Sequence, residues 1–176
     1  MLHIGIIVGT TREGRVGDQV ANWVLEKGKD SGLSLSIVDL KTYALPLLGT
    51  SVPSQLEAFQ KTIAALDGFI FVTGEYNHSI PASLKNAIDY LRDEWANKPA
   101  GIVSYGSLGG ARATEHLRGI LGELQVADVR SHTAFSMFTD FENWSTFKPN
   151  DMHLANLTTM FKQVKAWGEA LKTVRQ

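Results

Sequence analysis

Three short stretches combine glycine with hydroxyl, charged or aromatic residues, and each follows a run of apolar residues. They are residues 9–17, 74–79 and 105–110. Groups that form hydrogen bonds, carried on backbone that a ligand can approach closely, are suited to a binding site. In an open parallel α/β sheet the ligand lies beyond the carboxyl ends of the strands. The sequence therefore predicts that these three loops meet at one sheet edge and contact different parts of one ligand.

The first loop, residues 9–17, has the composition of an anion site. It contains three glycines, the hydroxyls of Thr10 and Thr11, and the guanidinium groups of Arg12 and Arg15. The helix expected after it would present its positive end to an anion. The loop has neither the Gly-Lys-Ser/Thr triplet of a P-loop nor the G-x-G-x-x-G fingerprint of dinucleotide sites. Two interpretations stay open: phosphate binding, and a glycine-rich turn with exposed arginines.

The second loop offers Glu75, Tyr76, Asn77, His78 and Ser79. Tyr76 and Asn77 are suited to flank and hydrogen-bond a flat heterocycle. Glu75 is expected to order the turn rather than to act as a catalytic acid, and His78 is expected to face solvent. Ser79 is a candidate N-cap of the following helix, with Pro81 in the first turn; ligand contact and capping are compatible roles for it.

The third loop, residues 105–110, contains three glycines and small side chains. It is interpreted either as a segment that brings backbone N–H groups close to a ligand or as a simple glycine-rich turn.

Hydrophobic periodicity predicts five strands that alternate with helices. The apolar runs 2–8, 69–73 and 101–105 predict buried strands, 33–38 predicts a strand nearer the sheet edge, and 126–130 predicts a weak final strand. Helices are expected from about 16 to 29, 56 to 66, 84 to 95, 113 to 124 and 154 to 171, with irregular segments at 43–54 and 131–149. This order predicts an α/β fold, a parallel sheet with helices on both faces, as one domain over residues 1–176.

Composition excludes several classes of function. A formal net charge of −1 disfavours a nucleic-acid or acidic-membrane surface, and the lack of cysteine excludes disulfides and thiol redox chemistry. The histidines have no metal-ligand spacing and no G-x-S-x-G motif occurs, so neither a metal site nor an α/β-hydrolase is predicted. The apolar runs are too short to cross a bilayer, and no signal peptide is visible at the N-terminus. A cytoplasmic protein is expected.

The three loops together resemble the NAD(P)H-dependent FMN reductase family, which includes quinone, chromate and azo-dye reductases. Residues 9–17 resemble its G-S-x-R-x-x-S phosphate loop, with Thr10 at the serine and Arg12 at the arginine. Residues 75–89, EYNHSIPASLKNAID, resemble its P-E-Y-N-x-S-x-P-x-x-L-K-N-A-I-D signature, and 105–110 resemble its glycine-rich third loop. Gly74 stands where the family usually has proline, and Val16-Gly17 replaces the second hydroxyl of the phosphate loop. The resemblance spans about residues 4–124.

The resemblance implies a flavodoxin-like three-layer sandwich with strand order 2-1-3-4-5. It also implies FMN as cofactor and NADPH or NADH as hydride donor to flavin N5. Backbone N–H groups in 106–109 would stabilise negative charge near flavin N1–O2, and the flavin carries the chemistry, so no catalytic side chain is expected. The implied cofactor-binding residues are Thr10, Arg12, Arg15, Val16, Gly17, Glu75, Tyr76, Asn77, Ser79, Tyr105, Gly106, Ser107, Gly109 and Gly110.

Further consequences of the resemblance concern partners. The electron acceptor is expected to be a small molecule such as a quinone, azo compound, flavin or metal oxyanion. A homodimer or homotetramer is implied, with the helix 84–95 and the aromatic segment 135–147 as candidate interfaces; ordinary packing against the sheet edge is the alternative for the aromatic residues. Arg15 would either contact a 2′-phosphate of NADPH or be a solvated loop charge. Of these two interpretations, we favour the solvated loop charge at this point. Other functions that stay open are a flavodoxin-like electron carrier, which the near-neutral charge disfavours, and a non-redox FMN-binding module.

Overall fold

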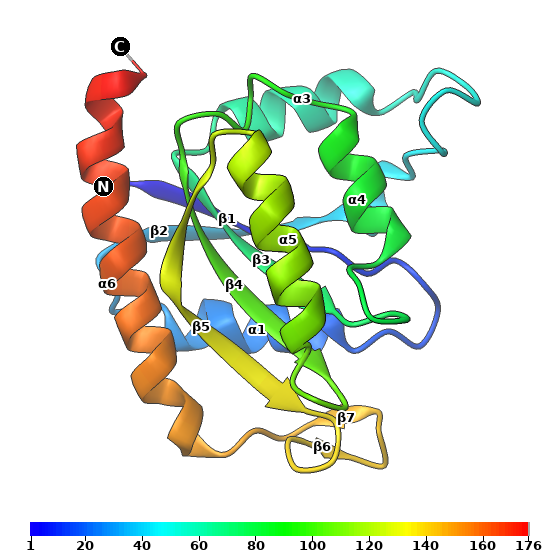
Figure 1. The fold of residues 1–176 in the computed structure, drawn as a ribbon, viewed down its shortest axis with the longest axis vertical. Coiled ribbons are helices and arrows are strands. Elements are labelled where there is room, and N and C mark those ends of the chain that lie inside the picture. Colours follow the sequence, from blue (N-terminus) through cyan, green and yellow to red (C-terminus); the bar gives the residue numbers. More distant parts are fainter. Residues whose placement is uncertain (176) are drawn as a thin grey trace.

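Five parallel strands form a central sheet in the computed structural model, which describes residues 1–175 (Figure 1). The strands are β1 (His3–Val8), β2 (Ser34–Asp39), β3 (Gly68–Gly74), β4 (Pro99–Gly106) and β5 (Ala127–Ser136). Their spatial order is β2-β1-β3-β4-β5, and every neighbouring pair is parallel. The predicted flavodoxin-like strand order is confirmed.

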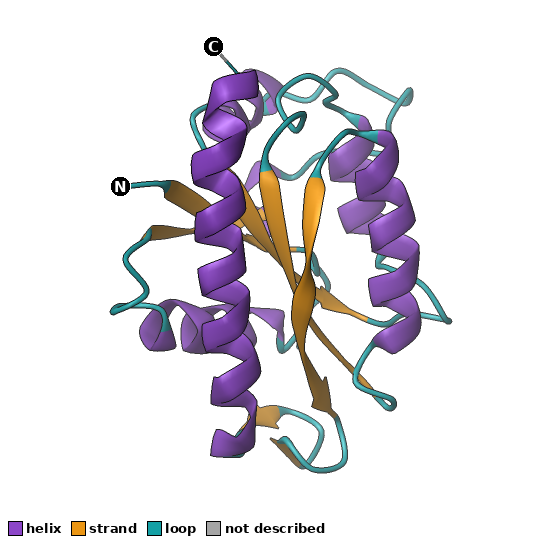
Figure 2. Ribbon diagram, turned by 60° about the vertical axis from the view of Figure 1, so that its left-hand side comes forward, coloured by secondary structure: helices purple, strands orange, loops and turns teal. Residues whose placement is uncertain are grey.

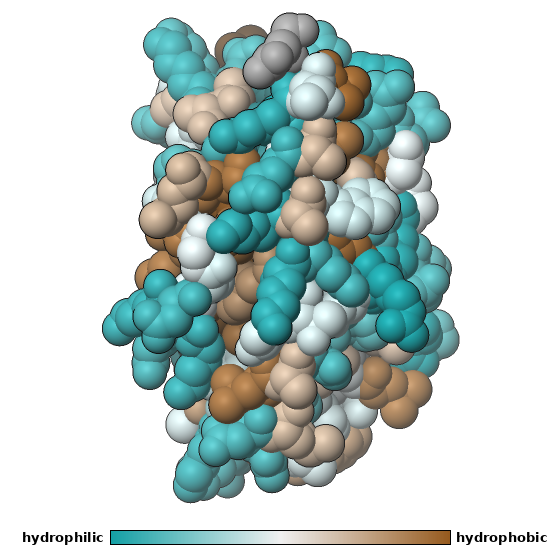
Figure 3. Space-filling model, turned by 90° about the vertical axis from the view of Figure 1, so that its left-hand side faces the viewer, coloured by the Kyte–Doolittle hydropathy of each residue, from teal (hydrophilic) through white to brown (hydrophobic). Residues whose placement is uncertain are grey.

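Helices cover both faces of the sheet, as Figure 2 shows. They are α1 (Gly17–Lys27), α2 (Leu40–Tyr43), α3 (Leu56–Ala64), α4 (Ala82–Asp89), α5 (Ala111–Glu123) and α6 (Leu154–Leu171). Short 3-10 helices at Asp151–His153 and Lys172–Val174 flank α6. One hydrophobic cluster joins α1 and α6 to one face, and a second joins α3, α4 and α5 to the other. Hydrophilic residues are interspersed with hydrophobic ones over the outer face that includes α6 (Figure 3).

The alternation of side chains along the strands produces these two layers. In β1, Ile6 packs in the layer of α1 and α6 while Ile7 packs in the opposite layer. In β3, Ile70 and Phe71 divide in the same way. All four side chains are fully buried. A strand buried on both faces has no polar positions, which is why these segments are continuous apolar runs.

The segment after the expected final strand differs from the prediction. β5 continues to Ser136, and an antiparallel hairpin of β6 (Phe141–Glu142) and β7 (Thr146–Phe147) follows it. Thr133 and Phe135 are buried where the sequence was expected to be irregular. The prediction of an irregular segment over 131–149 is therefore wrong, because the alternating burial at the end of β5 is set by packing on α1 and α6 rather than by local composition.

The region around α4 also corrects the sequence interpretation. α4 begins at Ala82 with Pro81 at the N-cap position and without a side-chain cap, so the predicted capping by Ser79 is wrong. The Ser79 hydroxyl lies 2.9 Å from Nδ1 of His116 instead. α4 ends at Asp89, earlier than expected, and the short α2 was not predicted at all.

The described part of the chain has no helix that is both long enough and apolar enough to span a membrane.

Candidate functional site

The three predicted loops meet at the carboxyl ends of β1, β3 and β4, where they surround a cavity of about 430 Å³. Of the residues implied by the resemblance, the structure places in its wall Arg12, Arg15, Val16, Glu75, Tyr76, Asn77, Tyr105, Gly106 and Ser107. Thr10, Gly17, Gly109 and Gly110 are buried and lie outside that wall. Ser79 lines a different hollow of about 560 Å³, which it shares with His116 between α4 and α5. Among residues 1–175, no group of three or more histidine or carboxylate side chains is arranged to hold a metal ion.

The first loop, residues 9–17, packs tightly on the end of β4. The Thr10 hydroxyl is buried and lies 3.3 Å from the phenol oxygen of Tyr105. A Cβ on Gly17 would come within 2.5 Å of the Thr10 hydroxyl, so only glycine lets α1 begin this close to the loop. Burial raises the pKa of Tyr105 to about 12, and the phenol therefore stays protonated and neutral near pH 7.

Arg15 belongs to an ion pair instead of facing solvent. Its Nη1 donates to Asp39 at 2.7 Å and to the carbonyl of Thr10 at 2.6 Å, and its Nη2 pairs with the other carboxylate oxygen of Asp39 at 2.5 Å. Its side chain is only 10% exposed, so the interpretation as a solvated loop charge is wrong. Burial would raise the pKa of Asp39, but hydrogen bonds from Arg15 and from the N–H of Lys41 hold that pKa below its ordinary value. The pair ties the loop to the end of β2.

Arg12, in contrast, is exposed and makes no ion pair with the residues that the structure describes. Its guanidinium lies 5.2 Å from the centre of the Tyr76 ring. The backbone N–H groups of residues 11–16 also form no hydrogen bond within the described chain. Free N–H groups at the start of a helix, together with an unpaired guanidinium, meet the requirements of a phosphate group. The residues present therefore fit the phosphate of FMN.

The second loop is a miniature hairpin. Tyr76 and Ser79 exchange backbone hydrogen bonds of 2.9 and 3.1 Å. Asn77 and His78 form the turn with φ values of 49° and 71°. Two successive positive φ values are typical of a type I′ turn, and asparagine tolerates this conformation well. The turn holds Tyr76, half-buried, at the wall of the cavity.

Glu75 connects the second loop to the start of α5. Its carboxylate forms an ion pair with Arg112 and accepts hydrogen bonds from the backbone N–H groups of Arg112 and Ala113. The side chain is 6% exposed. Burial would raise the pKa of Glu75, but the hydrogen bonds from Arg112 and from the two N–H groups hold it below the ordinary value. A carboxylate with all these partners is a structural anchor.

The third loop turns through two left-handed glycines, Gly109 and Gly110, with φ values of 68° and 74°. A Cβ on Gly110 would lie 3.0 Å from backbone atoms of Tyr105, which excludes larger residues. The N–H of Gly109 was expected to face the ligand. It donates to the carbonyl of Gly106 at 3.1 Å instead, so it is not available to a ligand. The N–H groups of Ser107 and Leu108 form no hydrogen bond with described residues. They are donors that this loop can offer to a ligand.

Beyond Gly14, which lies within the first loop, sequence reasoning missed two residues of the cavity wall, Met137 and Trp144. Both follow β5, in the segment that was expected to be irregular. The signal that could have found them is topological: β5 pairs in parallel with β4, so whatever follows β5 emerges at the same sheet edge as the third loop. The N–H of Met137 indeed donates to the carbonyl of Gly106 at 3.0 Å.

Comparison with known proteins agrees with the geometry. The sequence profile of the NADPH-dependent FMN reductase family matches residues 2–140. The chain belongs to this family.

Two relatives and one solved structure illustrate the similarity. The chain is 39% identical over 132 residues to an NAD(P)H-dependent FMN reductase of Schizosaccharomyces pombe, a match that covers 69% of this chain and 66% of that protein. It is 35% identical over 136 residues to a 2-hydroxy-1,4-benzoquinone reductase of Burkholderia sp., covering 71% of this chain and 73% of the relative. The structure of the flavoenzyme NAD(P)H:acceptor oxidoreductase of Paracoccus denitrificans superposes with a TM-score of 0.76 over 97% of this chain and 98% of that chain. At 19% identity, the last similarity shows the shared fold alone.

Proposed function

We propose that this chain is an NAD(P)H-dependent, FMN-containing oxidoreductase that reduces quinones. Membership of the FMN reductase family supports the nucleotide and the flavin. The observation that carries the proposal is the cavity at the sheet edge, whose surroundings combine free N–H groups and Arg12 with the aromatic rings of Tyr76, Tyr105 and Trp144.

Each loop has a separate task in binding FMN. Arg12 and the free N–H groups of residues 11–16 would hold the phosphate. The flavin ring would lie between Tyr76 and the N–H groups of Ser107 and Leu108, which are suited to stabilise negative charge on the ring. When bound, FMN supplies the chemistry of accepting a hydride from the nicotinamide and passing two electrons to an acceptor.

The side chains around the cavity then have to position the loops and exclude water. We assign Arg15 to bracing the phosphate loop, because Asp39 and the Thr10 carbonyl already occupy its guanidinium. We assign Glu75 and Arg112 to bracing the second loop against α5. Neither ion pair is free to transfer a proton, in keeping with a reaction in which the cofactor carries the difficult step.

A quinone is the acceptor that we favour among the small molecules considered. The similar Burkholderia protein is named for a benzoquinone substrate. The balanced reaction is NAD(P)H plus H⁺ plus quinone giving NAD(P)⁺ plus hydroquinone: the hydride supplies two electrons and one proton, and solvent supplies the second proton.

We further propose a homo-oligomer of this single FMN-binding domain in the cytoplasm. Phe135 and Phe141 are buried in the core, so the aromatic segment 135–147 does not form one continuous interface. These two residues pack inside the subunit, which was the alternative interpretation. The groove between α4 and α5, where Ile120 and Leu124 lie, is the better candidate. Light scattering after size exclusion tests the oligomer, and a monomer at working concentration would contradict it; cell fractionation tests the location.

The main experiment is a visible absorption spectrum of the protein after FMN is supplied and the excess removed, followed by anaerobic addition of NADH or NADPH. A retained flavin band that bleaches with nucleotide supports the reductase, and the faster nucleotide identifies the donor. A band that neither nucleotide bleaches would favour an electron carrier. No retained band would contradict FMN as the cofactor.

A further inference from the structure

The hairpin formed by β6 and β7 places an exposed aromatic residue at the rim of the cavity. Trp144 occupies the tip of the hairpin, lines the cavity and is 60% exposed. Phe138, which is 63% exposed, packs edge-to-face against it with ring centres 4.9 Å apart. Large exposed aromatic side chains beside a polar cavity are typical of surfaces that bind a partner or ligand.

The backbone at this tip is in an unfavourable conformation. Asn143 and Trp144 have φ values of 49° and 59°. Asparagine adopts the left-handed region readily, whereas tryptophan does so rarely because its side chain is bulky. Strain of this kind persists only where the surrounding structure enforces it, and it concentrates at functional sites.

The surrounding structure does enforce it. The side-chain amide of Gln19, on α1, donates to the carbonyl of Ser145 at 2.8 Å and accepts from the N–H of Phe147 at 2.9 Å. One residue of α1 therefore holds the chain on the β7 side of the tip, directly after Trp144, and limits how far the backbone there can relax.

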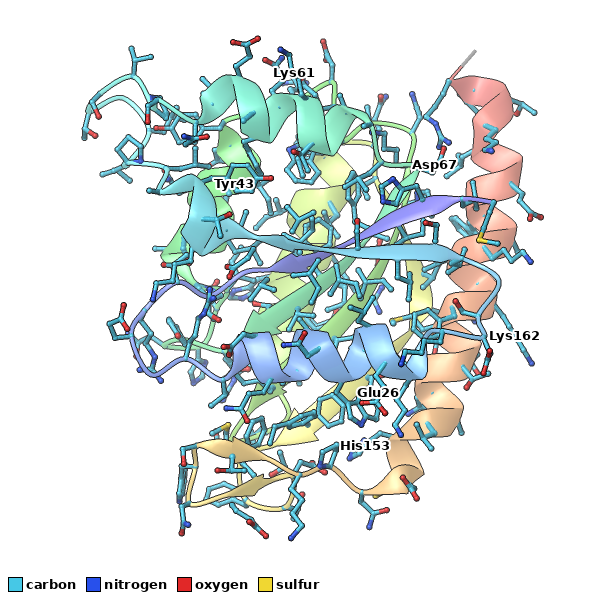
Figure 4. The ribbon with its side chains drawn as sticks, turned by 180° about the vertical axis from the view of Figure 1, so that it is seen from behind. Glu26, Tyr43, Lys61, Asp67, His153 and Lys162 are labelled. Atoms are coloured by element: carbon cyan, nitrogen blue, oxygen red, sulfur yellow. The ribbon has the colours of Figure 1, made fainter. Side chains whose placement is uncertain are left out.

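The base of the hairpin is fixed as well. Asp140 is 2% exposed and accepts hydrogen bonds from the N–H of Ser136, the hydroxyl of Thr139 and the ring of His153, the last at 2.8 Å. Figure 4 labels His153 where the hairpin joins α6. The backbone carbonyl of Asp140 accepts from the N–H of Lys148 at 2.8 Å. The hairpin thus presents Trp144 on a rigid support.

We propose that Trp144 determines acceptor specificity by packing its indole against the ring of a quinone in the cavity. This inference rests on the proposed function and names the residue that would select the acceptor. The face of an indole ring is electron-rich, whereas a quinone ring is electron-poor, so stacking of the two is electrostatically favourable. An inorganic acceptor such as ferricyanide has no ring to stack and gains nothing from Trp144.

The test compares two acceptors in variants that suit the backbone. Trp144→Gly removes the indole at a position where glycine is unstrained, and Trp144→Phe keeps an aromatic ring. With NAD(P)H as donor, we expect Trp144→Gly to lower the ratio of kcat/KM for 1,4-benzoquinone to kcat/KM for ferricyanide by about fivefold, and Trp144→Phe to restore most of it. Trp167→Ala is the control, since Trp167 is 49% exposed on α6 and lies outside the cavity wall; it should leave the ratio unchanged.

A second measurement needs no turnover. In FMN-loaded protein without nucleotide, benzoquinone should quench tryptophan fluorescence in a saturable way in the parent and in Trp167→Ala, and this component should be lost in Trp144→Phe. Should Trp144→Gly not fold, Trp144→Asn replaces it, because asparagine also tolerates a left-handed backbone.

The outcomes separate the inference from the proposed function. A parent protein that reduces ferricyanide with NAD(P)H while Trp144→Gly keeps the parent ratio would overturn the role of Trp144 and leave the reductase intact. Saturable quenching that survives in Trp144→Phe would overturn it too. A parent that oxidises neither nucleotide with either acceptor would remove the proposed function and the inference with it.

Discussion

Two loops of the cavity wall are each held by an ion pair, yet they present opposite surfaces to a ligand. In the first loop, residues 9–17, Arg15 is paired with Asp39, while Arg12 and the nearby N–H groups have no partner among the described residues. In the second loop, the only carboxylate, Glu75, is fully satisfied by Arg112 and two backbone N–H groups.

The difference shows how one sheet edge can hold a ligand that is charged at one end and flat at the other. An arginine already paired with a carboxylate adds rigidity without net charge, so the first loop keeps one positive charge for an anion. The second loop keeps none, which leaves Tyr76 and backbone groups for an uncharged ring. The following changes break or sharpen this contrast.

Breaking the ion pair of the second loop should have the largest effect. Glu75→Gln removes the buried negative charge that pairs with Arg112 and accepts hydrogen bonds from two backbone N–H groups. Because the Arg112 side chain is 35% exposed, the loss is smaller than for a fully buried pair, and we expect the free energy of unfolding to fall by about 2 kcal/mol. Urea unfolding at pH 7 measures it. Glu115→Gln is the matched control, because Glu115 pairs with Arg118 but is 74% exposed, and it should change stability by less than about 0.5 kcal/mol. Equal effects in the two variants would contradict the anchoring role of Glu75.

Removing the free charge of the first loop should act on binding rather than on folding. Arg12→Ala removes a charge-assisted hydrogen bond worth about 2 kcal/mol, so the Kd for FMN should rise roughly 30-fold. Titration of FMN fluorescence measures it. Riboflavin, which lacks the phosphate, serves as the control ligand and should bind parent and variant alike. An unchanged FMN affinity would remove the phosphate role of Arg12.

Breaking the ion pair of the first loop should cost less than in the second. Asp39→Asn removes the charge that pairs with Arg15 but keeps an acceptor oxygen, and Arg15 stays bound to the Thr10 carbonyl. The carboxylate that is lost is also more exposed than Glu75, at 23% against 6%. We expect a loss of about 1 kcal/mol in unfolding free energy. Asp30→Asn, at an exposed position of the same half of the chain, is the control. A loss as large as that of Glu75→Gln would mean that the two pairs do not differ.

Acid should reveal the smallest effect. The pKa values of Glu75 and Asp39 are lower in the folded chain than their ordinary values of 4.5 and 3.8. Each carboxylate therefore contributes stability that is present above its ordinary pKa and lost as the pH falls through the lower, folded value. Urea unfolding between pH 6 and pH 3 should show a weaker decline in Glu75→Gln than in the parent. Parallel declines would show that Glu75 is not among the responsible groups.

Much of this arrangement could be predicted from the sequence. Buried strands such as 69–73 have no polar position, and the signature at 75–89 carries its own strand, turn and helix context, so the sheet order and the cavity loops followed from it. The capping role of Ser79 could not be judged locally, because His116, 37 residues away, provides the partner that its hydroxyl takes.

Local pattern and long-range contact thus contributed different parts of this protein. The sequence by itself determined the alternation of strands and helices, the family, and the three loops that meet at the sheet edge, since these depend on periodicity and on residues close together in the chain. Only the tertiary structure decided which arginine is free, which N–H groups have no partner, and that the Trp144 hairpin joins the cavity. Those features depend on Asp39, Arg112 and Gln19, whose partners lie far away in the sequence and become neighbours only when the chain folds.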